Sequence, residues 1–80
     1  MNEKEYMYFV QEISDLFKDN AKKAKIEADN PKEGDSLDYN TGFLMAYHEV
    51  IAIMKNQAPF FHLKQEDIRL EDIEPERDLI

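Results

Sequence analysis

The sequence predicts an all-α protein, an antiparallel helical hairpin with a short, partly helical carboxyl-terminal tail. Two long stretches carry apolar residues at intervals of three and four, which is the spacing of one helix face. A stretch that contains Pro31 and Gly34 separates the two, and Pro59 follows the second apolar stretch. With 80 residues, the chain is long enough for one domain, and we treat residues 1–80 as a single helical domain.

The first predicted helix covers about residues 3–28. Asn2 can cap it, and Glu3 and Glu5 suit the positive end of its dipole. Its apolar residues are large at first and small later, which would let a neighbouring helix approach closely near the loop. They are Tyr6, Phe9, Val10, Ile13, Leu16, Phe17, Ala21, Ala24 and Ala28.

Residues 29–36 form the predicted loop. Pro31 cannot continue the first helix, because it lacks a backbone donor. Ser36 or Asp35 can cap the second helix by accepting a hydrogen bond from a free amide. A connection this short implies that the two helices are antiparallel neighbours.

The second predicted helix covers about residues 37–57 and ends before Pro59. It carries two adjacent apolar stripes, which make its apolar face wider than the roughly 100° of an ordinary surface helix. Gly42 lies inside it at a cost of about 1 kcal/mol relative to alanine, so we expect a close backbone crossing at Gly42 and Ala46, either with the first helix or with a second subunit. The first stripe consists of Leu37, Leu44, Tyr47, Ile51, Met54 and Ala58. The second stripe consists of Phe43, Ala46, Val50 and Ile53.

This excess apolar width predicts a homodimer packed as a four-helix bundle, since one hairpin of this length does not cover both stripes. A chain of this size is also marginally stable by itself. The expected interface residues come from the second helix. They are Phe43, Leu44, Tyr47, Val50, Ile51 and Met54.

The tail, residues 59–80, is expected to return to the hairpin. Phe60, Phe61 and Leu63 are too apolar to remain together in water. The triplet Glu-Asp-Ile occurs at 66–68 and at 71–73, and each copy is expected to place its isoleucine in the core. Pro75 can begin a last helical turn that ends in Leu79 and Ile80, and fraying of the last residues is the alternative. The sequence leaves open whether the tail packs on its own subunit or on a second one.

Charge and composition limit the class of function. The net charge of −8 disfavours direct binding to nucleic acid. The chain has no cysteine, no stretch typical of a signal peptide, and no apolar run of about 18 residues. These features predict a cytoplasmic protein that neither spans nor binds a membrane.

No residue pattern predicts catalysis, a cofactor or a metal. Asp38, His48 and Glu49 span too many turns to hold one ion, and His62 with Glu66 supplies too few ligands. We therefore expect both histidines to be exposed. The four tyrosines are expected in the core with their hydroxyl groups at its edge; they are Tyr6, Tyr8, Tyr39 and Tyr47.

Two segments resemble a known kind of protein. Residues 42–51, Gly-Phe-Leu-Met-Ala-Tyr-His-Glu-Val-Ile, continue to Met54, Gln57 and Ala58, and the tail carries Ile68-x-Leu70 and Ile73-x-Pro75. Together with the ending Asp78-Leu79-Ile80, they resemble small, acidic helical proteins of unknown function from Gram-positive bacteria and their mobile elements. The resemblance implies a compact helical domain.

Three hypotheses about function follow. The favoured one is a non-enzymatic protein–protein interaction module that acts as a homodimer and binds a further protein partner. The second is an acidic protein that neutralises a toxin, a nuclease or a DNA-binding protein, with binding that weakens steeply as salt rises. The third is a small ligand-binding protein or enzyme that uses Tyr47, His48 and Glu49.

Overall fold

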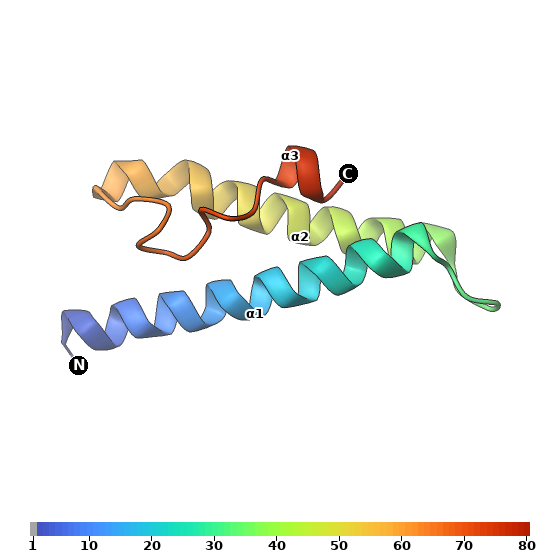
Figure 1. The fold of residues 1–80 in the computed structure, drawn as a ribbon, viewed down its shortest axis with the longest axis horizontal. Helices are drawn as coiled ribbons and strands as arrows, with labels where there is room; N and C mark the ends of the chain where they lie inside the picture. Colours follow the sequence, from blue (N-terminus) through green and yellow to red (C-terminus); the bar gives the residue numbers. More distant parts are fainter. Residues whose placement is uncertain (1) are drawn as a thin grey trace.

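The computed structural model describes residues 2–80 and is helical, with no β-strand among them. Helix α1 runs from Glu3 to Asp29 and α2 from Leu37 to Gln57. A 3-10 turn, η1, follows at Ala58–Phe61, and a four-residue helix, α3, covers Pro75–Asp78. The two long helices form a hairpin (Figure 1). Their bounds differ from those expected by at most one residue at either end.

Both long helices begin at the side-chain caps that the sequence indicates. Asn2 Oδ1 accepts a hydrogen bond from the Glu5 amide at 3.0 Å, and Ser36 Oγ accepts one from the Tyr39 amide at 3.2 Å. Asp35 instead orders the loop. It accepts from the Lys32 amide at 2.9 Å, and this hydrogen bond is the main reason that the Asp35 pKa lies below its usual value.

Gly42 does not mark a close helix crossing. A methyl group added to its Cα would meet no atom within 4 Å, and the residue is exposed. The expected backbone crossing with the first helix is therefore absent from the described chain, because Gly42 and Ala46 lie on the side of α2 that faces away from α1. A crossing with a second subunit at these residues stays a prediction.

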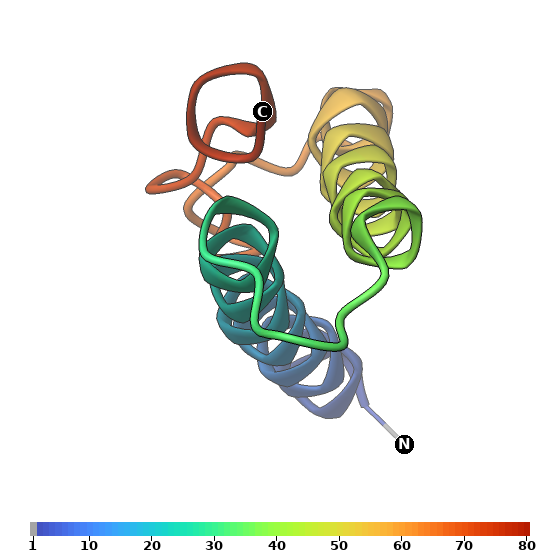
Figure 2. The ribbon, with the colours of Figure 1, turned by 90° about the vertical axis from the view of Figure 1, so that its right-hand side faces the viewer.

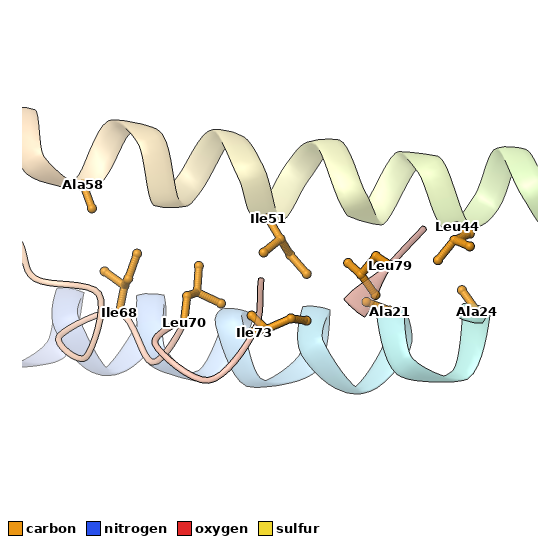
Figure 3. Packing of buried hydrophobic residues seen from close by; sticks show 9 residues of the cluster. All are labelled: Ala21, Ala24, Leu44, Ile51, Ala58, Ile68, Leu70, Ile73 and Leu79. Carbon is orange, nitrogen blue, oxygen red and sulfur yellow. The ribbon is translucent and has the colours of Figure 1, made fainter. Parts of the chain in front are cut away.

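The core lies where the hairpin meets the tail. Ala21 and Ala24 of α1 allow a close approach near the loop, as the taper of α1 predicts. Four of the nine buried apolar residues come from the tail, so this largely irregular segment supplies much of the interior (Figure 3). The buried set is Ala21, Ala24, Leu44, Ile51, Ala58, Ile68, Leu70, Ile73 and Leu79.

The tail packs on its own subunit and on one side of the hairpin (Figure 2). Ile68 and Ile73 are buried as expected, and Pro75 begins α3, which ends beside the buried Leu79. The two phenylalanines were predicted wrongly. Phe60 and Phe61 are 75% and 70% exposed, because the 3-10 turn at the end of α2 buries Ala58 and leaves these two side chains pointing away from the core.

Polar contacts hold the tail to both helices. Lys18 Nζ of α1 donates to Asp72 Oδ1 at 3.0 Å. On α2, Lys55 Nζ donates to the Ile73 carbonyl, and the Lys55 backbone carbonyl accepts from Gln65 Nε2 at 3.0 Å. Several polar groups of the tail are therefore paired with the hairpin, while its apolar side chains fill the core.

Candidate interaction surface

The hairpin exposes a continuous apolar surface on the side away from the tail, which we call the open face. On α2 its residues follow one another at helical spacing, and a second set on α1 lies on the same side of the hairpin. Apart from the loop that joins α1 to α2 at one end of the hairpin, no described segment lies on this side (Figure 2). Its exposed members are Tyr6, Phe9 and Leu16 of α1, and Tyr39, Phe43, Val50 and Ile53 of α2.

The floor of the open face is formed by half-buried residues at the junction of the helices, which are Ile13, Phe17, Tyr47 and Met54. Phe17 and Tyr47 meet edge to face with ring centroids 6.3 Å apart. Because the helices are antiparallel, this contact puts Ile13 and Phe9 level with Val50 and Ile53. The two sets of exposed side chains therefore border one shallow surface.

An aromatic ladder orders one end of this surface. Tyr39 stacks on Phe43 at 5.9 Å, and Phe43 meets Tyr47 edge to face at 5.2 Å. With Phe17, these rings run from the first turn of α2 across the floor to α1. Their mutual contacts restrict the rings before any partner arrives, which lowers the entropy cost of binding.

The exposed area is large for a protein of this size. Tyr6, Phe9 and Tyr39 are each 60–67% exposed, and Phe43 is 42% exposed. With about 200 Å² for each aromatic side chain and about 150 Å² for each aliphatic one, the open face presents roughly 650 Å² of apolar surface. The largest apolar patch on a typical monomer is about 300–600 Å², and it is often functional.

The structure divides the interface residues expected from the sequence into three groups. Phe43 and Val50 belong to the open face, and Tyr47 and Met54 form part of its floor. Leu44 and Ile51 are 4% and 0% exposed within one subunit, so they supply no new area to a dimer. They lie on the stripe of α2 that α1 and the tail cover.

The contribution of α1 to this surface was not predicted. Tyr6, Phe9 and Leu16 were placed on the apolar face of the first helix, and in the structure they lie at the edge of that face and remain exposed. Likewise, Tyr6, Tyr8 and Tyr39 are exposed, and only Tyr47 matches the expected half-buried tyrosine. A wide stripe on both helices is the sequence signal that could have shown this.

Unpaired acids border the open face. On α1, Glu5 and Glu12 flank Phe9, and Glu12 and Asp19 flank Leu16, at the three- and four-residue spacing of neighbours on a helix. On α2, Glu49 lies one turn before Ile53. We call Glu5, Glu12, Asp19 and Glu49 the acidic rim. All four are exposed, and none forms an ion pair with a basic residue of the described chain.

The residues considered for catalysis do not converge. Tyr47, His48 and Glu49 follow one another on α2, so each points about 100° away from the one before it. His48 is half-buried rather than exposed, because its Nε2 lies 3.4 Å from Glu76 Oε1 of α3. His62 is exposed as expected. The surface pockets between α1 and α3, beside Lys55 and at the loop are all lined by other residues.

Neither a metal site nor a membrane span is present in the part of the chain that the structure describes. Residues 2–80 hold no cluster of three or more metal-ligating side chains. None of their helices has both the length and the apolar character that crossing a bilayer requires.

The pocket between α1 and α3 has a volume of about 500 Å³. Lys22, Lys25 and Arg77 line it together with Asp72 and Asp78. Arg77 Nε lies 2.7 Å from Asp78 Oδ1, and Lys25 Nζ donates to Asp29 and to the Ile80 carbonyl. Since most of these charges already have partners, the pocket presents little free charge to a ligand.

Comparisons with known proteins give no relative to interpret. The chain matches no protein-family model, no curated protein and no solved structure.

Proposed function

We propose that this protein is a non-enzymatic interaction module whose open face binds a second polypeptide. The observation that carries the proposal is the position of Phe43, Val50 and Ile53. They are exposed on the same face of α2, and the chain's own tail covers the opposite side. A typical protein–protein interface buries about 800 Å² on each partner. The open face and its rim are large enough to supply that area.

A binding role accounts for features that a catalytic role does not use. Exposed aromatic rings are enriched in the centres of protein interfaces, and here they surround a floor of half-buried side chains. Polar groups, by contrast, are used to hold the tail. The homodimeric four-helix bundle expected from the sequence is one assembly that would cover the open face, and neutralisation of a basic protein is another.

Cysteine protection tests this proposal directly, because the natural chain contains no cysteine. An Ile53→Cys variant places one thiol on the open face, which we call the open-face thiol. The matched control, Glu71→Cys, places one on an exposed tail position, and we call it the tail thiol. Each variant is labelled with a maleimide, first as dilute purified protein and then inside the producing cell. We expect the open-face thiol to react at least tenfold more slowly in the cell than when purified and dilute, with the tail thiol unchanged.

The concentration of the purified protein supplies a second readout. Protection of the open-face thiol that develops as purified Ile53→Cys is concentrated identifies a second copy of the chain as the occupant. Equal labelling of this thiol in the cell, in dilute solution and in concentrated solution would contradict the proposal, since the face would then be covered by nothing.

A further inference from the structure

We infer that the open face takes a basic amphipathic helix of about 14 residues, one whose apolar stripe is flanked by lysine or arginine. This inference rests on the proposed function, because it names the chemistry of the partner at the same surface. Three features of the chain carry it: the shape of the face, the charge around it, and the way the tail uses the basic residues.

The shape fits a helix. Tyr39 and Ile53 mark the ends of the exposed stripe on α2, which spans about 21 Å at 1.5 Å per residue. The antiparallel pair of helices leaves a shallow surface along the junction, with Phe17 and Tyr47 at its floor. An apolar surface of this form is bound in many complexes by one amphipathic helix, which inserts side chains spaced at three and four residues.

The charge around the face selects the occupant. The acidic rim places Glu5, Glu12 and Asp19 in a line seven residues apart along α1, and Glu49 on the outer side of α2. A bound helix with lysine or arginine beside its apolar stripe would meet these carboxylates, whereas like charges placed opposite each other oppose association. The rim therefore favours a basic partner over an acidic one.

The tail explains why the rim remains unpaired. Lys18 binds Asp72, Lys55 lies 3.6 Å from Glu74, and Arg69 binds Asp15 at 2.8 Å. These basic groups are therefore directed to the covered side, away from the open face. The acids of the open face, in contrast, have no basic partner within 4 Å in the described chain. A two-fold dimer through this face would bring two acidic rims together, and so it is the less favourable occupant.

A pair of designed peptides tests the inference. One is an 18-residue leucine–lysine amphipathic helix, and the other has the same leucine pattern with glutamate in place of lysine. Each carries a fluorophore and is titrated with the full-length protein in an anisotropy measurement at low and at physiological salt. We expect the lysine peptide to bind, its affinity to fall as salt rises, and the glutamate peptide to bind at least tenfold more weakly.

Matched variants locate the binding. Glu5→Lys/Glu12→Lys should weaken the lysine peptide about tenfold, on the scale of a few exposed ion pairs. The tail pair Glu66→Lys/Glu71→Lys changes the net charge equally and should leave affinity unchanged. Val50→Glu should abolish binding. Circular dichroism checks whether each variant is folded. A variant that is unfolded is replaced by one with glutamine at the same positions.

Three outcomes that would count against the inference are distinguishable. The basic-helix inference is overturned if both peptides bind with equal affinity, or if the rim and tail variants lose the same affinity for the lysine peptide. The proposed function still stands in that case if the open-face thiol is protected in the cell. Protection of that thiol by the protein's own concentration, without preference for the lysine peptide, identifies the homodimer instead. Absence of both peptide binding and cysteine protection overturns the inference and the proposed function together.

Discussion

Arg69 and Asp15 are 54 residues apart in the chain, and the guanidinium Nη1 of Arg69 lies 2.8 Å from Asp15 Oδ2. Arg69 adopts a positive φ of 57°, which turns the tail sharply between the buried Ile68 and Leu70. The side chain that leaves this turn reaches α1. The contact therefore joins the tail to the hairpin at the point where two core side chains, on either side of Arg69, enter the interior.

The first prediction concerns the Lys18–Asp72 contact and pH. The hydrogen bond from Lys18 is the main cause that lowers the Asp72 pKa in the folded protein. A carboxyl group whose pKa is lower in the folded than in the unfolded protein stabilises the fold at pH values above its unfolded-state pKa of about 4. That contribution is lost as the pH falls through the folded-state pKa. Asp72→Asn should therefore lower the urea midpoint at pH 7 and have little effect at about pH 2.

Asp72 is half exposed, so the effect at pH 7 should be modest. The matched control is Glu71→Gln, which removes a neighbouring charge that makes no ion pair in the described chain. A loss of stability in Asp72→Asn that is equal at both pH values would contradict the prediction.

The second prediction tests the tail as a part of the core. Leu70 is fully buried, although it lies in a segment with no regular secondary structure. Leu70→Ala should destabilise the protein by about 2–5 kcal/mol, because it removes buried methyl groups and leaves a cavity. Ile80→Ala, at an exposed position of the same tail, should change stability by less than about 0.5 kcal/mol. Chemical denaturation of both variants measures this, and similar midpoints would show that the tail is not part of the cooperative unit.

The third prediction concerns the glycine inside α2. A Cβ at Gly42 would meet no neighbouring atom, so alanine should raise helix propensity without a steric cost. Gly42→Ala should stabilise the fold by about 0.5–1 kcal/mol. Gly34 provides the opposite case, since its φ of +91° is strained for any side chain, and Gly34→Ala should destabilise. Thermal unfolding distinguishes the two, and a destabilising Gly42→Ala would mean that this position is covered.

The fourth prediction separates the open face from the core. Ile53 is 52% exposed, whereas Ile51, two residues earlier, is fully buried. Ile53→Gln should leave the unfolding free energy of the dilute protein within about 0.5 kcal/mol of wild type, while Ile51→Val should cost about 0.5–1.5 kcal/mol. Denaturation at low micromolar concentration measures both. A large loss for Ile53→Gln in dilute protein would place this residue in the monomer's interior.

The sequence alone determined the helices, their ends and the acidic character of the chain. These properties depend on neighbours within one or two turns: Asn2 and Ser36 cap the helices next to them, Pro31 and Pro59 stop the helices before them, and apolar spacing sets the faces. Burial of Ile68 and Ile73 and the helical turn at Pro75 were also predictable, because each depends on a short local pattern.

Only the tertiary structure decided which side of the hairpin the tail covers. Both stripes of α2 are apolar. Helical periodicity gives the angle between the two stripes, but it does not indicate which stripe α1 and the tail will cover. The tail has no periodic pattern, so its course depends on long-range contacts such as Arg69 with Asp15 and Lys18 with Asp72. The packing that these contacts fix buries Leu44 and Ile51 and leaves Phe43, Val50 and Ile53 exposed beside unpaired acids.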